Sequence, residues 1–386
     1  MTNRVAIIGV GQSSFGKRPD SSIRDLTFEA FHEAIEDTKN LERDEIDASL
    51  VASSSGYDKQ RSPAAVIAGY LELNPQPTFL TEAACASSTV ALRTAWSFVK
   101  SGLHDVVAVI GYQKMTDMTS EAIQEVMGRA GDVMFESPFG TSMPAYYAMF
   151  ARAHMDAYGT TEEDLAKVSV KNHYYSQYNP KAMFQKEFTL EKVLSSRVIA
   201  SPLKSLDCCA NSDGASCLIV ANEAKAKKFA EQPVWIKGLG LGSTAMSLAS
   251  RNPPFTGFES AKEAARQAYA MASIKPTDID VAEVHDCFTI AELIAYGDLE
   301  FCKREDSPKM IRNEETHLGG RIPVNIDGGL LSKGHPVGAT GGSQIRTLVH
   351  QLRGEGGKMQ VDGAKIALGH NVGGIGMYTN VTILET

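Results

Sequence analysis

Hydrophobic and polar residues alternate along this 386-residue chain in two patterns, short apolar runs and amphipathic stretches. The run VAIIGVG, from Val5, predicts a strand that ends in glycines. The stretch LTFEAFHEAIEDT, from Leu26, has the i, i+3, i+4 apolar spacing of a helix. Strands therefore alternate with helices from the start of the chain, which predicts the α/β class.

The same pattern returns later in the chain. The segments EAFHEAIEDTKNLERDEIDASLVAS and EAARQAYAMASIKPTDIDVAEVHD each predict a helix, a connector with L/I-x-x-x-x-I-D, and an apolar strand. One gap pairs Leu41 with Ile274 and Asp47 with Asp280. Three more pairs of segments keep the same order: RVAIIGVGQSSFG with VWIKGLGLGSTAM, ALRTAWSFVKSG with QIRTLVHQLRG, and DVVAVIG with AKIALG. We predict a duplicated α/β unit with halves at residues 1–230 and 231–386.

The first half is longer because of an insertion at about residues 115–197, rich in Met, Tyr and polar residues. Thr161 and Asp164 have the spacing of a helix N-cap. An insertion of this size is expected to supply a lid or a substrate-binding subdomain.

Composition and charge exclude several classes of partner. The net charge of −8 argues against nucleic acid or an anionic membrane as the main partner. No secretory signal or long apolar segment is seen, so we expect no membrane span and a cytoplasmic location. Six cysteines, with Cys208 and Cys209 adjacent, do not make a disulfide framework in a chain this long.

Glycines after the first strand of each half raise the question of a nucleotide-binding loop. The motif from Gly9 to Ser14 lacks the third glycine of G-x-G-x-x-G, and the motif from Gly238 to Gly242 has a different spacing. No Lys-Ser/Thr pair follows either motif. We expect neither a nicotinamide nor an ATP site.

Cys85 is the first candidate for chemistry. It lies in EAACASSTVALRTAWSFV, just before a predicted helix whose N-terminus favours a thiolate. Taken alone, a packing role as a small buried hydrophobe is equally well supported. The stretch GGLLSKGHPVGATGG favours the nucleophile, because its glycine-rich loop presents His335 as a possible base for a thiol.

A third segment, ALGHNVGGIG, brings His370, Asn371 and Gly373 directly after a predicted strand. Backbone N–H groups at such a turn can form an oxyanion pocket.

Together these segments resemble the thiolase family, through AACASS and GHPVGATG. HDCF, KNHYYSQYNPKA and LDCCANSDGASCLIVANEA resemble the sterol-carrier-protein-X-type subgroup and its archaeal acetyl-CoA C-acetyltransferase relatives. The resemblance implies a duplicated five-layer α-β-α-β-α core with a loop region inserted in the N-terminal half. The repeat and the insertion predict the same arrangement independently.

His285 and Cys287, in HDCF, are open to three interpretations: metal ligands, packing residues or catalytic groups. The absence of paired C-x-x-C or H-x-x-x-H clusters disfavours a metal. Most thiolases have a second catalytic cysteine in a C-x-G turn, where this chain has Asn371-Val-Gly373. In the resembling subgroup the HDCF cysteine takes over that role, which implies Cys287. Alternate residues leaving a strand point the same way, so His285 and Cys287 can face one pocket.

The resemblance implies reversible Claisen condensation of acetyl-CoA to acetoacetyl-CoA. His335 would deprotonate Cys85, which becomes acylated while the N–H groups of Cys85 and Gly373 hold the oxyanion. Cys287 would then remove the α-proton of a second acyl-CoA, with His285 and His335 stabilising the enolate. No metal or redox cofactor is expected, and coenzyme A enters only as part of the substrate.

The resemblance also implies partners. We expect a homodimer or tetramer, and possible association with hydroxymethylglutaryl-CoA synthase through a zinc-ribbon/OB-fold protein, as in the mevalonate pathway. Two alternatives stay open: a C-acetyltransferase subunit of a complex acting on a non-CoA acceptor, and a mainly structural subunit. Cys85, His285, Cys287 and His335 together argue against the second, because only chemistry requires all four.

Overall fold

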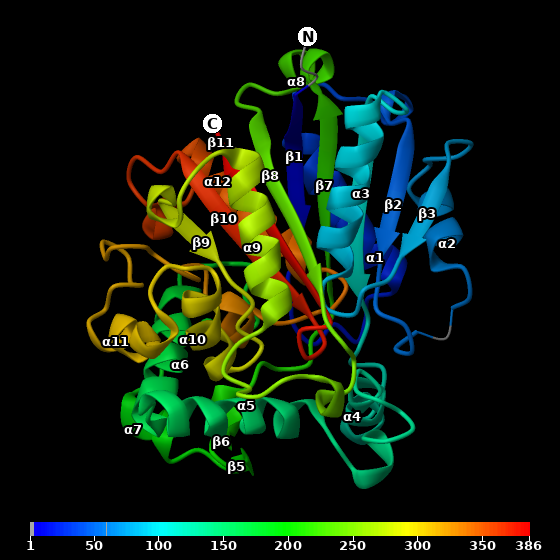
Figure 1. Ribbon diagram of the computed structural model, residues 1–386. Helices are drawn as coiled ribbons and strands as arrows, with labels where there is room; N and C mark the ends of the chain where they lie inside the picture. The colour runs from blue at the N-terminus through cyan, green and yellow to red at the C-terminus, as the bar shows by residue number, and fades with distance from the viewer. Residues whose placement is uncertain (1–3, 59) are drawn as a thin grey trace.

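The computed structural model describes residues 4–58 and 60–386, and its main sheet has nine strands (Figure 1). Their order is β3-β2-β4-β7-β1-β8-β11-β10-β9. The strands are β1 (Val5–Gln12), β2 (Ala48–Ala52), β3 (Thr78–Thr81), β4 (Val106–Gln113), β7 (Gly214–Asn222), β8 (Val234–Ser243), β9 (Val281–Glu283), β10 (Ile366–Gly373) and β11 (Tyr378–Glu385). A separate hairpin pairs β5 (Val198–Ala200) with β6 (Leu203–Lys204).

The α-helices alternate with these strands. They are α1 (Ile23–Glu36), α2 (Pro63–Tyr70), α3 (Ser87–Ser101), α4 (Ser120–Gly128), α5 (Met143–Tyr158), α6 (Glu162–Ser176), α7 (Leu190–Leu194), α8 (Glu223–Phe229), α9 (Glu259–Ala272), α10 (Thr289–Asp298), α11 (Ser307–Arg312) and α12 (Thr340–Arg353).

The main sheet consists of two related parts. In the first, β2 is parallel to β3 and β4, and β7 joins β4 to β1 in antiparallel pairing. In the second, β9 is parallel to β10, and β11 joins β10 to β8 in antiparallel pairing. Within the sheet, the two parts are joined where Ala6 pairs with Trp235 and Ile7 with Val234. The predicted boundary between the two halves, near residue 230, lies in the connection between α8 and β8. The division into halves at this point stays a prediction.

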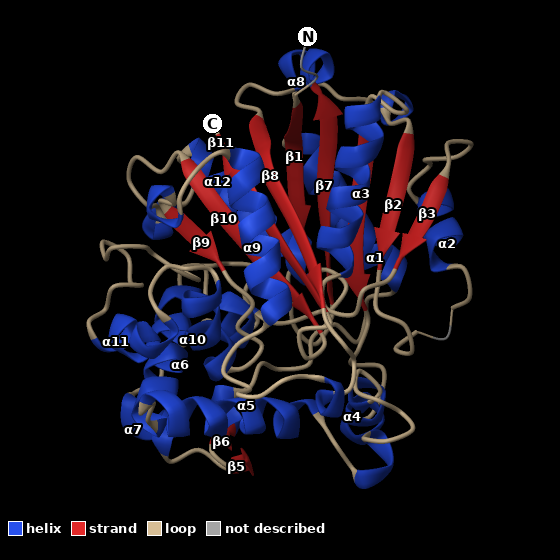
Figure 2. Ribbon diagram, in the orientation of Figure 1, coloured by secondary structure: helices blue, strands red, loops and turns tan. Residues whose placement is uncertain are grey.

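Helices separate and cover the two parts of the sheet (Figure 2). Helices α3 and α12 share one core with the inner faces of strands from both halves. Helices α1, α2 and α8 cover the outer face of the first part, and α9 and α10 cover that of the second. This is the predicted duplicated α-β-α-β-α arrangement of an α/β protein.

The aligned aspartates of the repeat have the same structural role. Asp47 Oδ2 accepts hydrogen bonds from the backbone N–H groups of Asp105 and Val106, at 2.7 and 2.9 Å, where β4 begins. Asp280 Oδ2 accepts from those of Lys365 and Ile366, at 2.8 and 2.9 Å, where β10 begins. Each aspartate satisfies N–H groups that the end of a strand would leave without partners.

The glycine motifs of the two halves allow a helix to lie directly against a strand. A Cβ added at Gly11 would lie 2.1 Å from the carbonyl oxygen of Ala30 in α1. One added at Gly240 would lie 1.7 Å from that of Ala264 in α9. Both distances are far below van der Waals contact, so these glycines serve packing between helix and strand.

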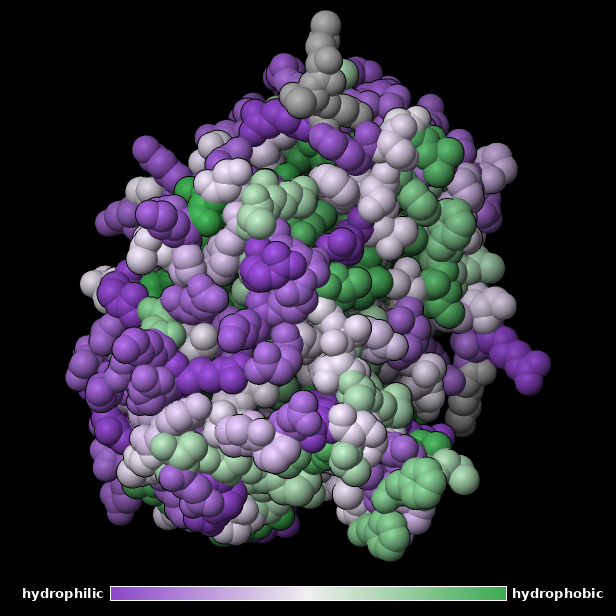
Figure 3. Space-filling model, in the orientation of Figure 1, coloured by the Kyte–Doolittle hydropathy of each residue, from purple (hydrophilic) through white to green (hydrophobic). Residues whose placement is uncertain are grey.

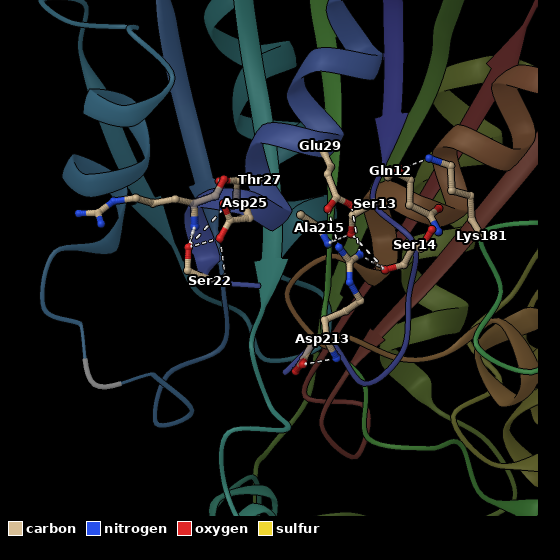
Figure 4. Close-up of polar contacts among 12 residues, drawn as sticks. Gln12, Ser13, Ser14, Ser22, Asp25, Thr27, Glu29, Lys181, Asp213 and Ala215 are labelled. Carbon is tan, nitrogen blue, oxygen red and sulfur yellow. Dashed lines mark hydrogen bonds and ion pairs between the residues drawn. The ribbon is translucent and has the colours of Figure 1, made fainter. Parts of the chain in front are cut away.

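Helix α1 starts three residues before the predicted Leu26. Ser22 and Asp25 form a capping box that satisfies N–H groups of the first turn (Figure 4). The predicted cap at Thr161 and Asp164 is likewise a capping box, at the start of α6.

The insertion contains α4 to α7 and lies beyond the end of the sheet at which β2, β3 and β9 finish (Figures 1 and 2). Lys181 donates to the carbonyl oxygen of Gln12 at 2.7 Å, which attaches the insertion to the end of β1 (Figure 4). Among the described residues, no helix combines the length and the apolar character needed to cross a membrane.

We predict that Gly240→Ala destabilises the protein by about 1–3 kcal/mol or more, because the new methyl group must displace α9 from β8. Gly69→Ala is the matched control, since a Cβ there meets only Asn74 Nδ2 at 3.5 Å and alanine is favoured in a helix. Unfolding by urea, followed by circular dichroism, measures both. Equal stability of the two variants would contradict the packing role of Gly240.

Candidate active site

Cys85 lies in the turn that leads into α3, beside a cavity of about 300 Å³. Ala84 before it has a φ of 51°, a left-handed conformation that non-glycine residues seldom adopt. The N–H of Gly374 donates to the Cys85 thiol, but burial outweighs it and raises the pKa of Cys85 to about 12. The sequence-based expectation of a thiolate is therefore wrong for the resting protein, because desolvation exceeds the effect of the helix N-terminus.

His335 lies on the glycine-rich loop, and its own backbone N–H donates to Ser212 Oγ at 2.7 Å. Its ring Nδ1 lies 2.7 Å from Thr340 Oγ1, whose proton goes to the carbonyl oxygen of Pro336 at 3.0 Å. Thr340 can then only accept, so Nδ1 carries the ring proton and Nε2 offers a lone pair. Burial lowers the pKa of His335 to about 3, so the ring is neutral at pH 7.

His285 has the opposite arrangement of its ring nitrogens. Thr89 Oγ1 donates to Asn371 Oδ1 at 2.9 Å, and Asn371 Nδ2 lies 3.1 Å from His285 Nδ1. The Asn371 amide donates to Nδ1, so the ring proton is on Nε2, and Nε2 has no protein partner. Burial, and the neighbouring His335 and His370, hold the pKa of His285 well below 6.5.

Three of the predicted catalytic residues converge. The Cys85 sulfur, one nitrogen of His285 and one nitrogen of His335 all lie within 4.8 Å of one another. The two histidine rings meet edge to face, with centroids 5.1 Å apart. One ring presents a lone pair and the other an N–H, so the cluster combines a proton acceptor and a proton donor around one thiol.

Cys287 is the fourth predicted residue and is 4% exposed. Its thiol contacts the hydroxyl of Tyr147. It also lies close enough to Cys85 for a charge on one sulfur to disfavour a charge on the other. Burial holds the pKa of Cys287 well above 9, so it too rests as a thiol. His285 and Cys287 thus face the same site as Cys85.

Asp286, between His285 and Cys287, joins the two loops that carry the catalytic candidates. Its carboxylate accepts from the N–H groups of Leu330 and Leu331, at 2.6 and 3.3 Å, on the loop that leads to His335. Asn172, from the insertion motif KNHYY, donates to the same carboxylate at 2.7 Å. Sequence reasoning missed this role, although Asp286 lies in HDCF and Asn172 in KNHYY.

Asn371 and Gly373 were predicted to serve the oxyanion or the substrate. The Asn371 side chain is engaged between Thr89 and His285, so it holds a histidine. The N–H that reaches the Cys85 sulfur belongs to Gly374, one residue after Gly373. The oxyanion role of the Gly373 N–H stays a prediction.

Two further side chains belong to the site and were missed. Tyr147, from α5, has its ring stacked on Phe288 with centroids 4.5 Å apart. Cys209 donates its N–H to the carbonyl oxygen of Cys287 at 3.0 Å. Its thiol lies close enough to Cys85 and Cys287 for a charge on either sulfur to raise the pKa of Cys209. The clustering of three thiols carried no signal in the sequence.

The cavity beside Cys85 has polar and apolar lining residues, and four of them are flexible methionines. Its other lining residues include Tyr57, Val126, Val337 and the methionines Met127, Met143, Met246 and Met377. Unbranched methionines adapt to ligands of varied shape, which suits an acyl chain.

Comparisons with known proteins identify the family of the chain. The thiolase N-terminal domain family matches residues 5–224, and the thiolase C-terminal domain-like family matches residues 241–386. Acetyl-CoA acetyltransferase from Methanothermobacter thermautotrophicus is 42% identical over 96% of this chain and 97% of its own. Sterol carrier protein 2 from Bos taurus is 35% identical over 100% of this chain and 73% of its own.

Solved structures show the same fold. The Ltp2-ChsH2(DUF35) aldolase superposes with a TM-score of 0.86 at 28% identity, over 99% of this chain and 98% of that one. Human mitochondrial 3-ketoacyl-CoA thiolase has a TM-score of 0.74 at 17% identity, over 100% and 99% of the two chains. The two family matches, and relatives that share the full length of the chain, establish that this protein belongs to the thiolase family.

Proposed function

We propose that the protein catalyses the reversible Claisen condensation of two acetyl-CoA molecules to acetoacetyl-CoA and free CoA. The observation that carries the proposal is that the Cys85 sulfur lies close to two neutral histidines. One of them, His335, offers a lone pair, and the other, His285, offers an N–H. The name of the archaeal relative, at 42% identity, supports acetyl-CoA as the substrate.

In the first half-reaction, His335 Nε2 takes the proton of Cys85 as the sulfur attacks the thioester carbonyl carbon. The C–S bond to CoA breaks, and the imidazolium returns the proton to the leaving CoA thiolate. Because the Cys85 thiol is neutral at rest, this nearby base is required. The N–H groups of Cys85 and Gly373 are proposed to hold the oxyanion.

In the second half-reaction, the Cys287 thiol first releases its proton to solvent, and the resulting thiolate removes an α-proton from a second acetyl-CoA. The His285 Nε2–H, which has no protein partner, is available to stabilise the enolate oxygen. The enolate carbon attacks the acetyl carbon on Cys85, and the released Cys85 thiolate receives the proton from Cys287. Cys287 is left as a thiolate and regains its proton from solvent, so both sulfurs end as thiols. The neutral His335 can contribute to enolate stabilisation through a water molecule whose hydrogen bond its Nε2 accepts.

We propose that this chemistry needs neither metal nor redox cofactor, with coenzyme A present only in the substrates. A metal ion bound by Cys85 and the two histidines would need a lone pair from each ring, whereas His285 presents an N–H. Transfer to a non-CoA acceptor, or a mainly structural role, is less well supported, because the site keeps all four chemical groups together.

Association between copies of the chain is also part of the proposal. Strand β3 forms one end of the main sheet, and its Phe79 and Leu80 side chains are 43% and 51% exposed. An open apolar edge is a suitable pairing surface for a second β3 in a homodimer. A second apolar surface, formed by Val133, Met134, Phe135 and Phe139, projects beside α4 (Figure 3).

This second apolar surface is a candidate contact for other proteins in a larger assembly. The name of the Ltp2-ChsH2(DUF35) aldolase joins two proteins, Ltp2 and ChsH2(DUF35). We propose comparable association here, with hydroxymethylglutaryl-CoA synthase and a zinc-ribbon/OB-fold protein as candidates in a cytoplasmic mevalonate pathway.

Replacement of the two cysteines separates the half-reactions. Cys85→Ala should lose the mass addition of one acetyl group after exposure to acetyl-CoA, because the nucleophile is absent. Cys287→Ala should keep this addition but lose exchange of acetyl-CoA α-protons with deuterated solvent. Intact-protein mass spectrometry and proton NMR measure the two steps, and surviving exchange in Cys287→Ala would reject Cys287 as the base.

The low pKa of His335, about 3, predicts how acylation depends on pH. A base with a depressed pKa stays unprotonated as the pH falls, so acyl-enzyme formation should change less than about twofold between pH 7.5 and pH 5. If the histidine had the ordinary pKa of about 6.5, the rate of acyl-enzyme formation would fall about thirtyfold over this range. Rapid-quench mass spectrometry of acylation gives the profile, and a steep fall would show that His335 titrates normally.

Loss of the Asn371 donor should impair enolate stabilisation while sparing acylation. In Asn371→Ala, the His285 ring can move its proton to Nδ1, and we expect α-proton exchange to fall by about tenfold or more. Thr89→Val should have the same direction of effect and Thr89→Ser a smaller one, because serine keeps the hydroxyl. Thr94→Val, on the same helix but outside the site, is the control. Equal exchange rates in all four variants would contradict this role.

A further inference from the structure

Tyr147 is a fully buried tyrosine that the proposed mechanism does not use. It comes from α5 in the insertion, whereas the four proposed catalytic residues come from the two halves of the core. Its ring stacks on Phe288 and meets Phe150 and Phe258 edge to face, with centroids 4.5, 5.7 and 6.2 Å away. Three aromatic neighbours leave the ring little freedom, so the position of its hydroxyl is well defined.

The hydroxyl lies between the two parts of the site that carry the thiols. It donates to the carbonyl oxygen of Gly374 at 3.1 Å and also contacts the Cys287 thiol. The N–H of the same Gly374 donates to the Cys85 sulfur. One residue, Gly374, therefore holds the first thiol with its N–H and the tyrosine beside the second thiol with its carbonyl.

We propose that Tyr147 is a positioning residue for Cys287, whose thiolate accepts the hydrogen bond of the Tyr147 hydroxyl during α-proton removal. While Cys287 is a thiol, the hydroxyl donates to Gly374. When the thiol loses its proton, rotation about the C–O bond redirects the hydroxyl to the sulfur. No proton leaves the tyrosine, and the thiolate gains a donor at the moment it forms.

The surroundings of Cys287 explain why such a donor is needed. Among the titratable groups near its sulfur, Asp286 disfavours a negative charge on Cys287, and Cys85 and Cys209 do so whenever they are ionised. Besides Tyr147, only the N–H of Phe288 favours the thiolate among the leading influences on Cys287. Arg251 interacts electrostatically with Tyr147 and is a cation near this hydroxyl. Burial keeps the pKa of Tyr147 well above 10, so the hydroxyl acts as a donor and not as a base.

The inference rests on the proposed role of Cys287, and one substitution tests it separately. Tyr147→Phe keeps the stacked ring and removes only the hydroxyl. We expect acetyl transfer to Cys85 to stay within about twofold of the unmodified protein, and α-proton exchange at pH 7 to fall about 10- to 100-fold, as for loss of a hydrogen bond to a charged group. The pH at which exchange is half-maximal should rise by about one unit or more.

Tyr146→Phe is the matched control, because its hydroxyl bonds to Glu136 and Thr141 away from the thiols. It should leave acylation, exchange and the pH profile unchanged. Replacement of Tyr147 by 3-fluorotyrosine, which makes the hydroxyl a stronger donor, should move the half-maximal pH of exchange downward. This second variant keeps the test decisive if Tyr147→Phe folds poorly.

The results separate the inference from the function on which it rests. Unchanged exchange and an unchanged pH profile in Tyr147→Phe, or no shift with 3-fluorotyrosine, would overturn the role of Tyr147. An equal fall of acylation and exchange would show a general structural effect and would also overturn it. Exchange that survives in Cys287→Ala would instead reject the proposed function of Cys287.

Discussion

The site depends on the buried carboxylate of Asp286, which joins the HDCF loop to the glycine-rich loop. It accepts two backbone N–H groups from Leu330 and Leu331 and the side-chain amide of Asn172. A buried carboxylate is costly unless such donors surround it, so the interaction holds only if the two loops and α6 come together. This one group places His285 and Cys287 opposite His335, and it makes the insertion part of the catalytic framework.

Around the thiol of Cys85, hydrogen bonds from two different partners give two identical side chains different chemistry. Thr340 accepts from His335 and leaves a lone pair facing the site, whereas Asn371 donates to His285 and leaves an N–H there. Both rings are buried and neutral at pH 7, so this difference is not erased by a shared positive charge. One site can therefore accept a proton and stabilise an oxyanion within a few ångströms.

Much of the fold and most of the site could be predicted because they depend on local patterns. The repeat of helix, connector and strand predicted the duplication, and the motifs around Cys85, His335 and HDCF identified the chemical groups. Helix boundaries were predicted within a few residues where capping residues mark them, as at Thr161. The missed groups, Tyr147 and Cys209, lie in segments whose local sequence resembles ordinary core or turn.

The sequence by itself determined the class of fold, the glycines that let helices lie against strands, and the identity of the four reactive side chains. Residue type and spacing act within a few residues and are sufficient for the fold class and the glycines, whereas the four side chains were identified through the resemblance to the thiolase family. Tertiary structure alone decided which nitrogen of His285 carries the proton, that both thiols rest uncharged, and which hydroxyl meets Cys287. Thr89 and Asn371 are 282 positions apart, and the burial that shifts each pKa is a sum over the whole core. No local pattern contains that information, because hydrogen bonding and desolvation depend on which distant segments the fold brings into contact.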